Sequence, residues 1–96
     1  MRSAGQLNVK AHMIFLAITP TGLMNALQVA DASISAIWCG SDAISEVDYG
    51  NLKCRNVSRF NYPLCGETQN ILDGALETIE DHHPNEVIWI ENVREL

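Results

Sequence analysis

Basic residues are scarce in this sequence. Its 96 residues include 6 lysines and arginines against 12 aspartates and glutamates, so the formal net charge at pH 7 is -6. An acidic surface repels phosphate backbones, which disfavours direct binding of DNA or RNA. The excess of acid is greatest from Glu67 to the end of the chain, where eight acids face one base, Arg94. The simplest interpretation of this segment is a solvated helix face that favours solubility, and the alternatives are a surface for a basic protein partner or for a divalent cation.

A long apolar run and a metal-ligand pattern are also missing. No apolar stretch approaches the roughly 18–20 residues that a membrane-spanning helix needs, so no membrane partner is expected. The first residues lack the continuous apolar segment of a signal peptide, which predicts a cytoplasmic location. The cysteines Cys39, Cys54 and Cys65 include no CxxC pair. We therefore expect reduced thiols, and neither a metal site nor a cofactor.

The segment from Met13 to Ile18 is the centre of the predicted fold. It is an unbroken apolar run that ends at a Thr-Pro-Thr-Gly turn, which is typical of a strand buried on both faces. Residues 34–39 and 86–91 have the same character, and their tryptophans are expected in the core, with a partner interface as the alternative. Residues 56–62 alternate between apolar and polar side chains, which predicts a strand at a sheet edge.

Three helices are predicted between these strands. The first begins with Thr21 as its N-cap residue. The second is short, with Ser41 as a plausible N-cap and with Ile44 and Val47 facing inward. The third covers about residues 67–83, where apolar residues recur at helical spacing and acids occupy the opposite face.

Strands that alternate with helices indicate an α/β fold of the order βαβαβαβ, in which a mainly parallel four-stranded sheet carries three helices on its two faces. We assign residues 12–92 to this single domain, residues 1–11 to a flexible lead-in and residues 93–96 to a tail. If the middle helix does not form, the alternative is an α+β ferredoxin-like βαββαβ sheet covered on one face.

Ligands of open parallel sheets bind beyond the carboxyl ends of the strands. This rule selects the loops that follow the first three predicted strands, which contain residues 19–22, 39–42 and 65–68. None of these loops contains a lysine or arginine, and none matches a P-loop or a dinucleotide-binding fingerprint. The predicted topology places no histidine beside either loop cysteine, so we assign no catalytic residues. The candidate ligand-binding residues are Thr19, Thr21, Gly22, Cys39, Ser41, Asp42, Cys65, Glu67 and Thr68.

Two functions fit these observations. The first is a small acidic protein-interaction or regulatory domain of the inhibitor or adaptor type, with a basic protein or a second copy of the chain as its partner. The second is a small-ligand or nucleotide-binding domain, or a minimal hydrolase, that uses the three loops. The residues predicted for the interaction surface of the first are Glu77, Glu80, Asp81, Trp89 and Glu91.

Overall fold

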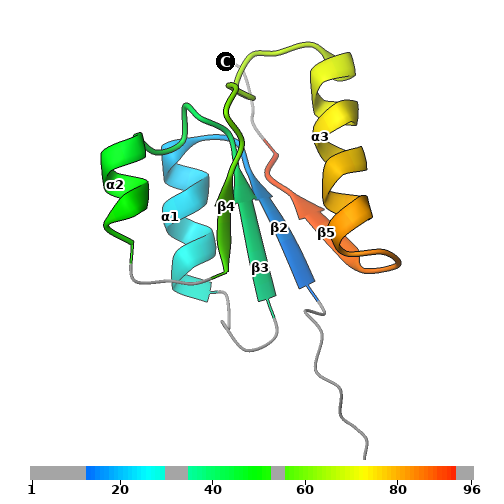
Figure 1. The fold of residues 1–96 in the computed structure, drawn as a ribbon, viewed down its shortest axis with the longest axis horizontal. Coiled ribbons are helices and arrows are strands. Elements are labelled where there is room, and N and C mark those ends of the chain that lie inside the picture. Colours follow the sequence, from blue (N-terminus) through cyan, green and yellow to red (C-terminus); the bar gives the residue numbers. More distant parts are fainter. Residues whose placement is uncertain (1–12, 30–34, 53–55, 93–96) are drawn as a thin grey trace, which may run out of the picture.

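A computed structural model describes residues 13–29, 35–52 and 56–92 of the chain. Helices lie on both sides of a central sheet (Figure 1). The predicted lead-in and tail lie outside the described residues. With the labels of Figure 1, the elements are β2 (Met13–Ala17), α1 (Pro20–Val29), β3 (Ser35–Cys39), α2 (Glu46–Gly50), β4 (Val57–Arg59), α3 (Gln69–His82) and β5 (Val87–Ile90).

The sheet has four strands in the order β4-β3-β2-β5, and every neighbouring pair is parallel. The chain adds β3 and then β4 on one side of β2, and α3 carries it back to add β5 on the other side. The predicted α/β fold is therefore confirmed. The ferredoxin-like alternative is wrong, because α2 forms and no described strand pair is antiparallel.

Two separate apolar layers hold the helices on the sheet. Alternate residues of a strand point to opposite faces, so Ile14 and Leu16 pack under α3, whereas Ala17 packs under α1. All five residues of β3 are buried, including Trp38, which lies against the ring of Phe60 with centroids 5.2 Å apart. The prediction that β3 is buried on both faces is thus confirmed.

Two helix starts differ from the prediction. The first helix begins at Pro20, so Thr19 and not Thr21 is its N-cap residue, and proline takes the first helical position, where its missing amide hydrogen costs nothing. Residues 41–43 form a turn, which delays the second helix until Glu46 with Ser45 as its N-cap. This delay turns Val47 outward, where 73% of its surface is exposed, against the expectation that it faces the core.

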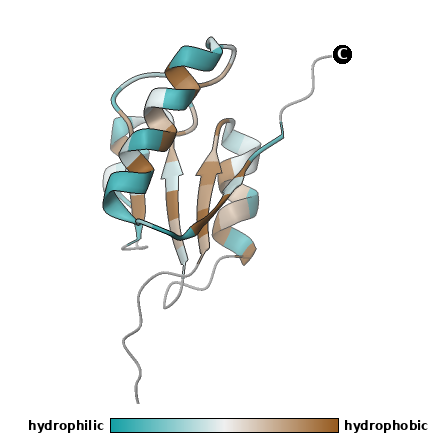
Figure 2. Cartoon of the chain, turned by 90° about the vertical axis from the view of Figure 1, so that its right-hand side faces the viewer, coloured by the Kyte–Doolittle hydropathy of each residue, from teal (hydrophilic) through white to brown (hydrophobic). Residues whose placement is uncertain are grey.

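The last strand is far more exposed than its sequence predicted. In β5, the exposed fractions of Val87, Trp89 and Ile90 are 59%, 56% and 49%. The expectation of two dry faces, with Trp89 in the core, is therefore wrong for this strand. Helix α1 packs against β2 and β3, and no helix follows β5 within the described residues, so part of the β5 surface has no cover. Figure 2 shows β5 running along the outer side of the sheet.

Candidate functional site

The turn between β2 and α1 is the first of the three loops predicted to bind a ligand. The side-chain oxygen of Thr19 accepts a hydrogen bond from the Gly22 amide at 3.0 Å, which caps α1. The amides of Ile18 and Thr19 are directed to the space beside this helix start, where the helix dipole favours negative charge. Thr21 is exposed to solvent. The turn therefore presents the donors that an anion requires.

The carboxylate of Glu91 already occupies this space. Glu91 follows β5 directly, and its Oε1 accepts hydrogen bonds from the Ile18 amide at 2.6 Å and the Thr19 amide at 2.8 Å. The Thr19 hydroxyl donates to Oε2 at 2.5 Å. The loop thus binds a carboxylate of its own chain, and an external anion at this point would have to displace it.

The Glu91 carboxylate lies against Gly22, which has no side chain to exclude it. A Cβ atom built on Gly22 would lie 2.0 Å from Oε1 and 2.2 Å from Cδ of Glu91. Any side chain at this position would therefore overlap the carboxylate. Sequence reasoning assigned Gly22 to an external ligand and Glu91 to an interaction surface. It missed their contact because the two residues are far apart in the sequence.

The second and third loops are joined by Asp42. One oxygen of its carboxylate accepts a hydrogen bond from the Leu64 amide at 3.2 Å, and the other accepts one from the Cys65 amide at 3.1 Å. Gly40 permits this approach, since a Cβ atom there would lie 2.9 Å from both Asp42 Oδ1 and the Leu64 backbone nitrogen. The carboxylate of Asp42 therefore has a structural role in connecting the two loops.

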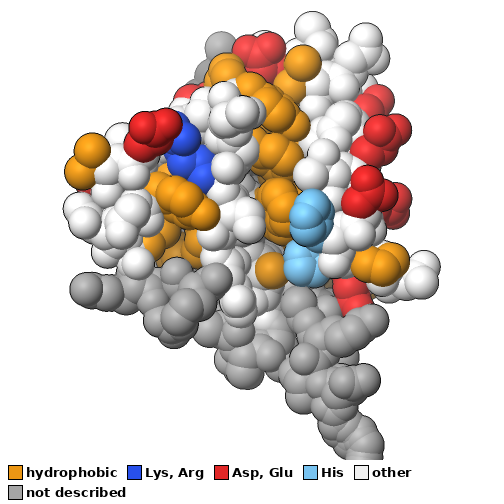
Figure 3. All heavy atoms as spheres, viewed as in Figure 1, with side chains coloured by type: hydrophobic (Ala, Val, Ile, Leu, Met, Phe, Trp, Pro, Cys, Tyr) orange, Lys and Arg blue, Asp and Glu red, His pale blue; other side chains and the backbone are white. Residues whose placement is uncertain are grey.

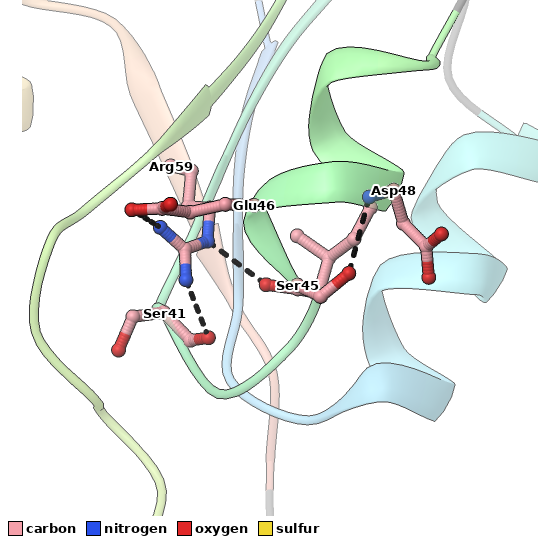
Figure 4. A network of polar contacts seen from close by, with 6 residues as sticks. Ser41, Ser45, Glu46, Asp48 and Arg59 are labelled. Carbon is pink, nitrogen blue, oxygen red and sulfur yellow. Dashed lines mark hydrogen bonds and ion pairs between the residues drawn. The ribbon is translucent and has the colours of Figure 1, made fainter.

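Arg59 holds the second loop from the side of β4 (Figure 4). Its Nε donates to the Ile44 carbonyl at 2.8 Å and its Nη2 donates to the Ser41 carbonyl at 3.0 Å. Its Nη1 lies 3.9 Å from Glu46 Oε2, and only 15% of the arginine side chain is exposed. Arg59 is the only lysine or arginine among the described residues, so within this part of the chain no such side chain is available to an anionic ligand.

The two described cysteines differ in solvent access. Cys39 is fully buried. Burial raises the pKa of its thiol to about 11, an effect that Arg59 opposes and Asp42 reinforces. A helix dipole can stabilise a thiolate at the end of a strand, but burial dominates for Cys39, so this thiol is not a nucleophile near neutral pH. Cys65 is exposed.

The nine predicted ligand-binding residues do not meet in one cavity. Thr19 and Gly22 meet at Glu91, whereas Asp42 and Cys65 meet through a single hydrogen bond at the second and third loops. Of the nine, only Gly22 lines either of the two grooves described below. Three more are exposed to solvent and lie outside both grooves: Thr21, Glu67 and Thr68.

A groove of about 390 Å³ runs between β5 and α1. Its apolar lining includes Phe15, Val29 and Trp89, and its polar lining includes Asn25 and Asn92. The strand register brings Phe15 and Trp89 together, because they are opposite each other on the paired strands β2 and β5 and point to the same face of the sheet. A helix packed over β5 would cover these apolar side chains, but among the described residues α1 packs against β2 and β3.

A second groove, of about 560 Å³, lies between β5 and α3 on the opposite face of the sheet. Its apolar floor is formed by Leu76, Ile88 and Ile90. Acidic side chains also line this groove, and Figure 3 shows such side chains gathered along α3. Within the described residues none of the groove's acids forms an ion pair. The four acids that line the groove are Asp73, Glu77, Glu80 and Glu86.

Comparisons with known proteins do not connect the chain to a family. No protein-family profile, no curated protein and no solved structure matches it. Within the described residues, histidine, cysteine, aspartate and glutamate form no group of three that could hold a metal ion. Nor does this part of the chain contain a helix with the length and apolar character needed to cross a membrane.

Proposed function

We propose that this chain is a protein-interaction domain that binds its partner along β5. The observation that carries the proposal is the exposure of Val87, Trp89 and Ile90, which leaves an apolar strand half open to water. Contiguous apolar surface of this kind is typical of binding sites, and tryptophan is enriched among residues that dominate binding energy. Each face of β5 also opens onto a groove.

The two edges of the sheet support this proposal by their contrast. Natural proteins protect edge strands by making them short or by placing charges on them. The edge strand β4 has only three residues and includes Arg59, which is held by carbonyls of the second loop. The edge strand β5 is apolar throughout, with the sequence Val-Ile-Trp-Ile. Among the described residues no further strand pairs with this edge, and an apolar edge of this kind is suited to pairing with another chain.

The ligand-binding alternative receives less support from the loop geometry. The anion position at α1 is filled by Glu91, and the carboxylate of Asp42 is engaged by two backbone amides. Cys39 is buried and its raised pKa keeps the thiol protonated near neutral pH, so Cys39 is not an activated nucleophile. For these reasons we place the binding surface on β5 and not on the three loops.

Selection from a random-peptide display library tests the proposal. Selected binders are measured against the wild-type chain, against Val87→Lys on β5, and against Val47→Lys on α2 as a matched control. Both valines are exposed, so each change replaces the same side chain on the surface and adds the same charge. Circular dichroism of each variant confirms that it is folded before binding is measured.

We expect binders whose affinity falls in Val87→Lys and is retained in Val47→Lys, because lysine on an edge strand opposes strand pairing. If the library yields no binders, or if its binders are insensitive to Val87→Lys, the proposal that β5 is the binding surface is wrong.

A further inference from the structure

We infer that β5 accepts an extended basic segment of another protein as an additional strand, with lysine or arginine on every second residue and apolar residues between them. The inference rests on the proposed function and names the chemistry of the partner. An added strand would pair with the open edge of β5 and project its side chains alternately to the two faces of the sheet. The two faces of β5 differ in charge, and this difference defines the partner.

The face toward α3 is suited to basic side chains. Four acids line this groove, three on α3 and one, Glu86, directly before β5. Within the described chain no lysine or arginine pairs with them. Leu76, Ile88 and Ile90 form the floor between them. Lysine and arginine carry long apolar stems below a charged end, so their stems can cover this floor while the charged ends reach the carboxylates.

The face toward α1 is suited to apolar side chains. Val87 and Trp89 point to this face because they alternate with Ile88 and Ile90 along the strand. Trp89, Phe15 and Val29 line the groove beside them. An added strand with lysines toward α3 would direct its intervening residues here, and apolar residues at those positions would shield Trp89 from water.

Charge argues against a second copy of this chain as the occupant. Two copies that pair through β5 about a two-fold axis perpendicular to the sheet would place their α3 helices on the same face. The acids Asp73, Glu77 and Glu80 of one copy would then lie toward those of the other. Like charges brought together at an interface oppose association, whereas a basic strand neutralises the same acids.

The test uses an octapeptide in which valine and lysine alternate, a counterpart in which glutamate replaces each lysine, and fluorescence anisotropy of the labelled peptides. Glu80→Lys is compared with Asp81→Lys, since the two variants change the net charge equally but only Glu80 lines the groove. Val87→Lys places a lysine on the edge strand, which opposes strand pairing, and so tests whether the peptide pairs with β5. The emission of Trp89 reports whether its exposed ring becomes covered, because Trp38 is already buried.

We expect the valine–lysine peptide to bind with a blue shift of tryptophan emission and the glutamate counterpart not to bind. Glu80→Lys should weaken binding by roughly five- to tenfold, since reversing one charge costs on the order of 1 kcal/mol, and Asp81→Lys should change it by less than about twofold. Equal binding of the two peptides, or equal effects of the two substitutions, overturns the inference.

Two further outcomes separate this inference from the proposed function. Library binders that depend on Val87 but lack basic residues would overturn the basic partner and leave β5 as the binding surface. A dimer in light scattering that becomes a monomer in Val87→Lys would identify a second copy as the occupant, and this also overturns the inference while β5 remains the interface.

Discussion

Replacing Gly22 by alanine tests its contact with the Glu91 carboxylate, which connects the beginning and the end of the domain's sequence. The new Cβ atom would lie 2.0 Å from Oε1 of Glu91, where no real contact is tolerated. The carboxylate must then leave the start of α1, and it loses its hydrogen bonds from the Ile18 amide, the Thr19 amide and the Thr19 hydroxyl.

The expected loss of stability follows from these bonds. Hydrogen bonds to a charged group contribute about 1.5–3 kcal/mol each when buried, but Glu91 is partly exposed and water replaces some of them. We therefore expect a loss of about 2–3 kcal/mol, from which the better helix propensity of alanine subtracts up to about 1 kcal/mol. The net cost of about 1–2 kcal/mol corresponds to a fall in Tm of roughly 5–15 °C.

A double-mutant cycle with Glu91→Ala isolates the contact. Stability is measured by urea unfolding followed by circular dichroism. In the Glu91→Ala background the carboxylate is gone, so Gly22→Ala should cost nothing or stabilise by up to about 1 kcal/mol. The coupling energy should be about 2 kcal/mol. The matched control is Gly74→Ala in α3, where a Cβ atom meets no atom within 4 Å, and it should stabilise the chain by about 0.5–1 kcal/mol.

An equal cost of Gly22→Ala in both backgrounds would refute this reasoning. The cost would then come from the backbone of the turn, and the close approach of Glu91 would not be the reason for glycine at this position.

Three other predictions concern the loops and the end of α3. Asp42→Ala should lower the free energy of unfolding, measured with urea, by about 1–2 kcal/mol, because it leaves the amides of Leu64 and Cys65 without their acceptor. An unchanged unfolding midpoint would contradict this role. In a Cys54→Ser background, native protein should alkylate at Cys65 and not at Cys39, whose thiol pKa is raised to about 11, and mass spectrometry of native and urea-unfolded samples checks this. Burial, and then the charge of His82, lower the pKa of His83 below 6.5. The unfolded chain therefore binds more protons than the folded chain near pH 6, and the free energy of unfolding falls as the pH is lowered. His83→Gln should reduce the fall in Tm between about pH 7.5 and pH 5.5, and an unchanged pH dependence would count against His83 as its source.

The sequence alone was enough to predict the elements and their order. Apolar character on both faces identified β2 and β3 as central strands, and helical spacing of apolar residues identified α3. Alternation of strands and helices then predicted the parallel sheet that the structure contains. These predictions succeeded because periodicity and apolar content are local properties that any packed domain must satisfy.

Only the tertiary structure decided the position of β5 and the partners of the loop residues. The segment around Trp89 is as apolar as a central strand, but its exposure depends on strand order and on which helix lies above it. The carboxylate of Glu91 meets amides more than 70 residues away, and Asp42 meets amides more than 20 residues away. Local sequence does not specify such hydrogen bonds, because their partners come together only when the complete sheet has formed and its strand ends lie side by side.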